Sequence, residues 1–151
     1  MQYKNPESVL VVIFCSSTQR CLMLQRQDDA NFWQSVTGSL ELGETPYQAA
    51  LREVNEETSI DIKKDNYLLI DTKQIVEFEI FPQFKHRYAP NVTTNREHWF
   101  YLSLPHEIMP ILTEHLDYQW LSYDKAAEIT VSWNNRQAIE SINDIRCKEN
   151  I

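Results

Sequence analysis

Glycine is scarce in this chain, and its only two glycines, Gly38 and Gly43, lie close together in one short segment. Because glycine allows unusual backbone conformations and close approach, we expect that segment to need one or the other. The chain also lacks internal repeats, low-complexity tracts and Ser- or Gly-rich linkers. Nothing therefore marks an interior boundary, and residues 1–151 are predicted to form a single domain.

Cysteine and long apolar runs are also scarce. The three cysteines, Cys15, Cys21 and Cys147, are odd in number and lack metal-like spacing, which argues against a disulfide framework and favours a reducing compartment. The longest apolar run, residues 9–15, is too short to cross a membrane, and no basic segment precedes it as in a signal peptide. A cytoplasmic location without a membrane partner is the expectation.

Positive charge is in deficit, with 14 Lys and Arg against 22 Asp and Glu, for a formal net charge of -8. Such a chain repels long nucleic acids unless it carries a basic patch, and none is evident in the sequence. A nucleic acid polymer is therefore not expected as a partner. A small anion can still bind if a cation mediates.

The hydrophobic pattern predicts an α/β fold with hairpins, in which a mixed β-sheet is sandwiched between α-helices. Buried, β-branched or alternating segments indicate strands, whereas a proline after a capping residue followed by a 3.6-residue period indicates a helix. The predicted strands cover residues 8–16, 20–26, 32–38, 67–71, 76–81, 99–104 and 118–121, and the predicted helices cover residues 46–58, 123–129 and 132–145.

The helix predicted at residues 46–58 gathers Glu53, Glu56 and Glu57 near its C-terminal end. Like charges three or four residues apart on a helix destabilise it by about 0.2–0.5 kcal/mol per pair. A solvated surface, softened by an Arg52–Glu56 pair, is the simplest explanation. The alternative is a metal site, because carboxylates are preferred ligands of Mg²⁺ and Mn²⁺.

The segment GSLELGETPYQAALREVNEETSI, residues 38–60, resembles the Nudix box G-x5-E-x7-R-E-U-x-E-E-x-G-U, in which U is apolar. One position departs from this pattern, since Ser59 replaces the second glycine and could change the turn that leaves the helix. The matching positions are Gly38, Glu44, Arg52, Glu53, Val54, Glu56, Glu57 and Ile60.

Resemblance to the Nudix family implies an α/β/α sandwich and a divalent-metal-dependent hydrolase that cuts a pyrophosphate linkage. It assigns Glu53 and Glu57 as metal ligands for Mg²⁺, with Mn²⁺ possible, and Glu56 as a further ligand or a group that orients water. Arg52 is expected to hold the helix. Glu44 either complements the helix dipole or pairs with Arg52.

The segments that flank the box resemble a bacterial branch of this family that acts on dihydroneopterin triphosphate. This similarity implies release of pyrophosphate, formation of the monophosphate and a place early in folate synthesis. Broader hydrolysis of deoxynucleoside triphosphates such as dATP is the alternative, because guanine and pterin share a hydrogen-bonding edge. A non-catalytic binding module is less favoured, since it needs no acidic cluster.

The same resemblance carries over further site residues, and each also has a structural explanation. Lys4 and Arg26 are either phosphate ligands or surface cations, and Thr37 either contacts phosphate or caps a turn. The residues expected to contact substrate are Lys4, Arg26, Thr37, Phe78, Glu79, Ile80, Phe81, His115 and Ser132, with Glu114 as a third metal ligand or a proton acceptor.

The stretch FEIF, residues 78–81, alternates as a strand does, so both phenylalanines are either core residues or a stacking surface for a pterin. Glu79 is a hypothetical acceptor for the amino and ring N–H groups of that pterin. His115 is promoted only by the resemblance. The cationic stretch FKHRYAP, residues 84–90, either docks phosphates or is solvated.

Overall fold

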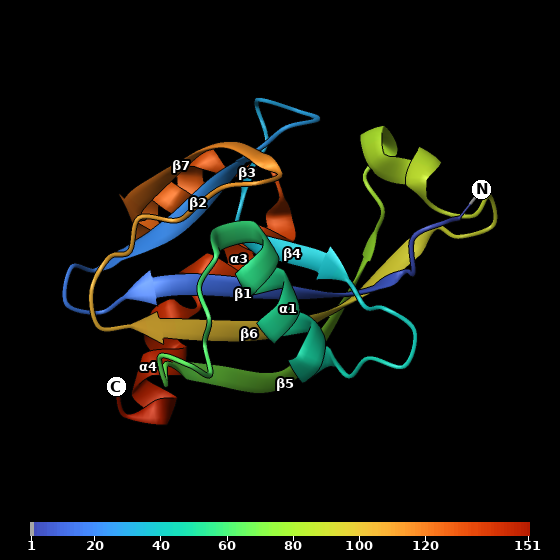
Figure 1. Ribbon diagram of the computed structural model, residues 1–151. Helices are drawn as coiled ribbons and strands as arrows, with labels where there is room; N and C mark the ends of the chain where they lie inside the picture. Colours follow the sequence, from blue (N-terminus) through green and yellow to red (C-terminus); the bar gives the residue numbers. More distant parts are fainter. Residues whose placement is uncertain (1) are drawn as a thin grey trace.

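A seven-stranded mixed sheet forms the centre of the computed structural model, which describes residues 2–151 (Figure 1). Its strand order is β3-β2-β1-β6-β5, with β4 pairing with β1 and β7 pairing with β2. Among the strand pairs of the described residues, only β1–β6 is parallel. The strands are β1 (Glu7–Cys15), β2 (Arg20–Arg26), β3 (Trp33–Gln34), β4 (Val36–Ser39), β5 (Leu68–Glu79), β6 (Thr94–Leu104) and β7 (His115–Ser122).

Helices cover both faces of the sheet, which confirms the predicted α/β sandwich (Figure 1). Strand β1 shows why its sequence is apolar throughout: Val9, Val11 and Ile13 pack on the same side as helix α1, whereas the alternate residues pack against the C-terminal helices. The helices are α1 (Pro46–Thr58), α2 (Tyr123–Ile129), α3 (Trp133–Glu140) and α4 (Ile142–Glu149), with a 3₁₀ helix η1 (Pro82–Arg87). No helix within residues 2–151 is long and apolar enough to span a membrane.

Two predicted elements are each divided in the structure. The strand expected at residues 32–38 breaks at Ser35, because the chain leaves β2 there to pair with β1, and the Ser35 N–H donates to Asn135 Oδ1 at 2.9 Å. The helix expected at residues 132–145 breaks at Ser141, whose hydroxyl donates to the Gln137 carbonyl at 2.9 Å. A serine that binds the preceding turn in this way commonly bends a helix.

Two other predicted strands, residues 67–71 and 76–81, are one strand in the structure. The register of β5 against β6 is irregular between Asp71 and Ile75, where Lys73 has φ 61°. This irregularity breaks the hydrophobic alternation, and the sequence pattern therefore suggested two strands. Strand β6 also begins at Thr94, earlier than predicted. Residues 84–87, the first part of the segment expected as a loop at residues 84–90, belong to η1.

Helix α1 has the limits that its sequence predicts. Thr45 is its N-cap and forms a capping box with Gln48, and Pro46 opens the first turn. At the other end Ser59 adopts the left-handed conformation, with φ 68° and ψ 12°. The turn favoured by glycine is therefore retained, and the expectation that Ser59 changes the turn is wrong.

Because a left-handed conformation is unfavourable for a residue with a Cβ atom, Ser59→Gly is predicted to stabilise the protein by about 0.5–1 kcal/mol. Urea denaturation measures this change, with Ser59→Ala as the matched control because alanine retains the Cβ atom. A lower midpoint for the glycine variant than for wild type would contradict the prediction.

Candidate active site

Two of the three clustered glutamates of α1 are buried, rather than forming a solvated surface. Glu53 and Glu57 are 9% and 2% exposed, whereas Glu56 is exposed. The same helix buries Ala49, Ala50 and Val54 against the sheet, so its position is fixed by apolar packing. The packing of α1 on the sheet therefore holds the carboxylates of Glu53 and Glu57, which lie on successive turns, in buried positions beside the hydrophobic core.

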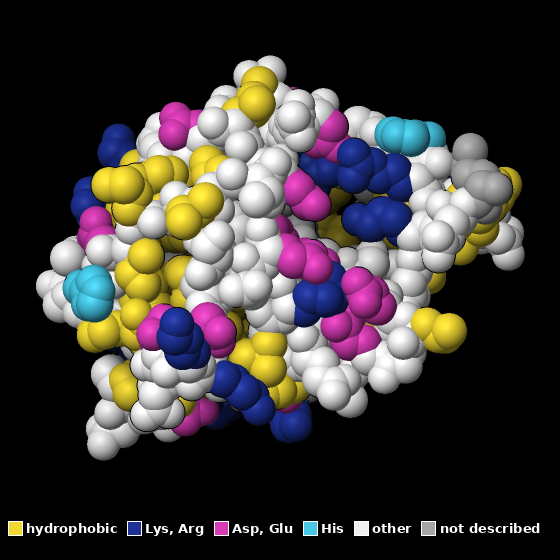
Figure 2. All heavy atoms as spheres, in the orientation of Figure 1, with side chains coloured by type: hydrophobic (Ala, Val, Ile, Leu, Met, Phe, Trp, Pro, Cys, Tyr) yellow, Lys and Arg dark blue, Asp and Glu magenta, His cyan; other side chains and the backbone are white. Residues whose placement is uncertain are grey.

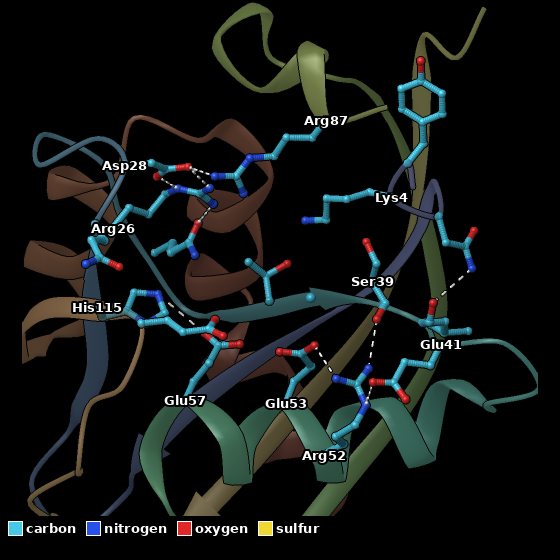
Figure 3. A pocket seen from close by; sticks show the side chains of 18 of the residues that line it. Lys4, Arg26, Asp28, Ser39, Glu41, Arg52, Glu53, Glu57, Arg87 and His115 are labelled. Carbon is cyan, nitrogen blue, oxygen red and sulfur yellow. Dashed lines mark hydrogen bonds and ion pairs between the residues drawn. The ribbon is translucent and has the colours of Figure 1, made fainter. Parts of the chain in front are cut away.

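Arg52 orients one of these carboxylates. Its Nη1 donates to Glu53 Oε1 at 2.7 Å, and its Nη2 donates to the Ser39 carbonyl at 2.9 Å. Glu44 accepts from Nε at 2.7 Å and from Nη2 at 2.8 Å, so it is bound in a bidentate salt bridge. This geometry favours the salt-bridge interpretation of Glu44 over the dipole interpretation. The contacts of Arg52 with Glu53 and Ser39 (Figure 3) agree with the expectation that it holds the helix.

Gly38 provides the space that Glu53 occupies. A Cβ atom added at Gly38 would lie 2.1 Å from Glu53 Cδ, far inside van der Waals contact. The glycine expected from the motif is therefore required for close approach by a side chain. Gly43, in contrast, has φ 79° and open space around it, so it serves the backbone turn before α1.

Glu57 is a buried carboxylate without a compensating partner. Neither of its oxygens has a hydrogen-bond partner in the described part of the chain, and the His115 Nε2 atom lies 3.6 Å from Oε1. Burial, followed by the neighbouring Glu53 carboxylate, raises the pKa of Glu57 well above its usual range. Burial also lowers the pKa of His115 to about 4, so this imidazole is neutral and supplies no balancing charge at pH 7.

A cleft of about 990 Å³ opens above these carboxylates. Lys4, Arg26 and Arg87 lie across it from α1, and Asp28 accepts hydrogen bonds from both arginines (Figure 3). In the space-filling view, Lys and Arg atoms border one side of the hollow and Asp and Glu atoms border the other (Figure 2). An overall acidic protein thus carries local positive charge opposite its acidic pair.

A smaller inner cavity, of about 70 Å³, adjoins the cleft and shares Lys4, Arg26 and Thr37 with it. Four phenylalanines, Phe32, Phe78, Phe81 and Phe84, form much of its wall, and the ring centroids of Phe32 and Phe84 are 5.4 Å apart. Glu97, which is 2% exposed, also lines it. The site therefore combines a wide polar cleft with a narrow pocket of aromatic and buried polar groups.

The family model described as NUDIX domain matches residues 4–142. The chain belongs to the Nudix family. The family assignment confirms the resemblance of the box, and the arrangement of strands and helices agrees with it. Nudix hydrolases are generally dependent on a divalent metal.

Two curated relatives of this Nudix protein share most of its length. It is 59% identical over 138 residues to the dihydroneopterin triphosphate diphosphatase of Escherichia coli strain K12, covering 91% of this chain and 92% of the relative. It is 54% identical over 140 residues to the enzyme of the same name from Haemophilus influenzae, covering 93% and 89% respectively. The solved structure of the E. coli dihydroneopterin triphosphate pyrophosphohydrolase superposes with a TM-score of 0.92, at 58% identity, covering 94% of this chain and 97% of that one.

The structure brings most of the predicted site residues of this Nudix domain together. The larger cleft is lined by Lys4, Arg26, Thr37, Glu53, Glu57, Glu114 and His115, and the inner cavity is lined by Phe78, Ile80, Phe81 and Ser132 in addition to the shared residues.

Two predicted residues line neither cavity. Glu56 is exposed, and its carboxylate accepts from Arg52 Nη1 at 3.2 Å. Glu79 follows Phe78 on β5 and is exposed, because successive side chains of a strand point to opposite faces. The structure therefore does not support Glu79 as a pterin acceptor.

Two predicted contacts are already engaged with the protein itself. The Thr37 hydroxyl donates to the Val9 carbonyl at 3.0 Å across the sheet, and Ser132 caps α3 by accepting from the Asn135 N–H at 3.3 Å. Both residues line the inner cavity, but their hydroxyl groups help to hold the fold there.

Sequence reasoning missed Glu97 and Asn134 and left Arg87 undecided within a cationic stretch. A signal for Glu97 was present, because Asn95, Glu97 and Trp99 alternate along β6 and all three are buried. Polar residues at the inward positions of a strand are unusual and commonly serve a site. Arg87 reaches the cleft only because η1 turns the chain back toward Asp28.

The donor set fits a divalent cation. Glu57 offers two unpartnered buried oxygens, and Glu53 lies beside it. Within residues 2–151, no three side chains of His, Cys, Asp or Glu are gathered closely enough to enclose a metal by themselves. Mg²⁺ usually binds one or two carboxylates together with waters and substrate phosphates, so two carboxylates facing a cationic cleft suffice.

Gly38→Ala is predicted to weaken Mn²⁺ binding by about 10- to 100-fold, because the added methyl group displaces the Glu53 carboxylate. The fold should persist, since the clash falls on the end of a side chain. Isothermal titration with Mn²⁺, alongside thermal unfolding, tests both statements. Glu128→Gln, exposed on α2 and outside the cleft, is the control, and equal affinity of wild type and Gly38→Ala would contradict the account.

Glu57→Gln is predicted to stabilise the metal-free protein by about 1–3 kcal/mol at pH 8, because it removes a buried carboxyl group that folding either leaves charged without a partner or forces to take up a proton. The pKa of Glu57 is raised in the folded state, so its contribution is present below the ordinary value of 4.5 and is lost as pH rises through the folded-state pKa. The advantage of the variant should therefore grow with pH.

Denaturation in EDTA from pH 5 to pH 8 measures this difference, with the exposed Glu128→Gln as control. Adding Mn²⁺ should stabilise wild type and leave Glu57→Gln unchanged. A variant that is less stable than wild type throughout this range would show that Glu57 is compensated in the fold.

Proposed function

We propose that this protein hydrolyses dihydroneopterin triphosphate to dihydroneopterin monophosphate and pyrophosphate, as a divalent-metal-dependent Nudix enzyme of folate biosynthesis. The names of relatives that are 54–59% identical over about nine-tenths of the chain support this substrate. The observation that carries the proposal is the pairing of Glu53 and Glu57 opposite Lys4, Arg26 and Arg87 across one cleft.

Magnesium is the metal proposed for this site, with manganese as a substitute, and Glu53 and Glu57 are the residues that would hold it. A cation held by these two carboxylates would supply positive charge for the polyphosphate oxygens and would lower the pKa of a bound water. Arg52 keeps the Glu53 carboxylate in place through the 2.7 Å contact. The exposed carboxylate of Glu114, at the cleft, serves either as a further ligand or as the acceptor of a proton from the attacking water.

In this proposal the phosphates bind to Lys4, Arg26 and Arg87, which lie across the cleft from α1. Burial, followed by the charges of Arg87 and Arg26, lowers the pKa of Lys4, which indicates three cations held near one another. An anion with several charged oxygens relieves that repulsion on binding. Arg26 is preoriented, because Asp28 accepts from its Nε at 2.7 Å and Gln34 Oε1 accepts from its Nη1 at 3.2 Å.

Two catalytic assignments follow from the position of the remaining groups. His115, neutral and 3.6 Å from Glu57, limits the space around that carboxylate and excludes water from it. Glu56 orients Arg52 from the solvent side and is the second candidate for the proton acceptor, because Arg52 places it next to Glu53. The inner cavity is left for the heterocycle of the substrate.

The proposal predicts pyrophosphate release from dihydroneopterin triphosphate in the presence of Mg²⁺, at a kcat/KM above those for dATP and dGTP. Glu57→Gln should lower kcat by at least about 100-fold, since loss of groups that only support a ligand costs 10- to 100-fold. Glu128→Gln, exposed on α2 and outside both cavities, should retain full activity.

The panel also separates the alternatives. Faster hydrolysis of dATP than of the pterin compound would favour a broader nucleotide hydrolase. Binding of triphosphates without release of pyrophosphate would favour a binding module. Either result would overturn the proposed reaction.

A further inference from the structure

Glu97 is a buried carboxylate that the chemistry of phosphate release does not use. It lies on β6 and is 2% exposed, and within residues 2–151 it forms no ion pair with Lys, Arg or His. Burial raises its pKa to about 7. A buried acid without a cation is costly and needs another explanation.

Within residues 2–151, side-chain donors occupy only one oxygen of Glu97. Trp99 Nε1 donates to Oε1 at 3.0 Å, and Asn134 Nδ2 donates to the same atom at 2.7 Å. In the described part of the chain, no side-chain hydrogen bond reaches Oε2, and Glu97 lines the inner cavity. One oxygen is thus held in place while the other is available to a ligand.

The position of Glu97 is fixed by a chain of polar contacts from α3. Asn134 Oδ1 accepts from the Ser132 hydroxyl, Ser132 Oγ accepts from Asn135 Nδ2 at 3.1 Å, and Asn135 Oδ1 accepts from the Ser35 N–H at 2.9 Å. All of these residues are buried. Such a satisfied network is typical of a preoriented site rather than of a packing accident.

A second unpaired acceptor belongs to the same cavity. Asn95 lies two residues before Glu97 on β6, its Nδ2 donates to Ser8 Oγ at 2.7 Å, and its Oδ1 is buried without a donor. Two acceptors of this cavity, Glu97 Oε2 and Asn95 Oδ1, are therefore without a donor within residues 2–151, and Phe78, Phe81 and Phe84 form aromatic walls beside them. A flat ring whose edge carries several N–H groups complements this cavity.

We propose that Glu97 is the specificity-determining residue for the base, accepting hydrogen bonds from the ring N–H and 2-amino groups of a 2-amino-4-oxo heterocycle. This inference rests on the proposed function for its substrate. Asn95 Oδ1 is a further acceptor for the same edge, and the ring lies against the phenylalanines. The candidate expected from the FEIF stretch, Glu79, is exposed and lies outside the cavity, which argues against this role.

The proposal explains discrimination between bases. A pterin, like guanine, presents adjacent donors to a carboxylate, whereas adenine presents a ring acceptor at the corresponding place. Bound adenine would leave Glu97 Oε2 without a hydrogen bond and would place the lone pair of a ring nitrogen against a lone pair of that oxygen. Sites built around a buried polar group discriminate strongly against ligands that leave it unpaired.

Glu97→Gln tests this role with little change in shape. The glutamine oxygen can still accept from Trp99 and Asn134, while its NH₂ group replaces the free carboxylate oxygen and opposes the donors of a pterin. The ratio of kcat/KM for dihydroneopterin triphosphate to that for dATP is expected to fall by at least about 100-fold. Because the carboxylates of α1 are untouched, kcat for dATP should stay within about threefold of wild type.

Two further variants sharpen the comparison. Glu77→Gln, exposed on β5 and outside both cavities, is the matched control and should leave the ratio unchanged. Glu79→Gln tests the rival acid, and a fall in the ratio for this variant alone would overturn the assignment. An unchanged ratio in a Glu97→Gln protein with wild-type thermal stability would also overturn it.

Fluorescence titration with dihydroneopterin, which carries no phosphate, separates this inference from the proposed reaction. Wild type should bind it at least about tenfold more tightly than Glu97→Gln. If wild type binds dihydroneopterin but releases no pyrophosphate from its triphosphate, the proposed reaction fails while the role of Glu97 stands. Equal binding by the two proteins would overturn the role of Glu97 even if the reaction proceeds.

Discussion

The repulsion between the buried carboxylates of Glu53 and Glu57 is the constraint that the rest of the site serves. The protein neutralises one of them, because Arg52 donates to Glu53 at 2.7 Å, and leaves both oxygens of the other without a partner. Buried charge of this kind destabilises a fold unless a counter-charge arrives. A divalent cation would supply this counter-charge, and its remaining positive charge would be available to phosphates in the cleft.

The fold places complementary groups around that pair. Apolar packing of α1 against β1 fixes the acidic side of the cleft, whereas Lys4 precedes β1, Arg26 ends β2 and Arg87 ends η1 on the other side. Residues of β5, β6 and α3 line the inner cavity. Different elements around one end of the sheet therefore carry the residues proposed to bind the metal, the phosphates and the heterocycle.

The sequence was sufficient wherever chemistry and spacing are local. The N-cap candidate Thr45, the proline at position 46 and the acids of one helix predicted α1 with its limits and its carboxylates. The sequence was insufficient where contacts between distant parts of the chain determine the structure. The break at Ser35 depends on a change of strand partner, and the contacts of Arg87 depend on Asp28, which is distant in the chain. The acid nearest the predicted aromatic stretch, Glu79, faces solvent, while the buried Glu97 comes from the neighbouring strand.

The most direct measurement of the central claim is anomalous diffraction from crystals grown with Mn²⁺ and a non-hydrolysable dihydroneopterin triphosphate analogue. The account predicts a manganese peak within coordination distance of both Glu53 and Glu57, with phosphate oxygens completing its ligands. A fully bound analogue with no anomalous peak near either carboxylate would contradict it.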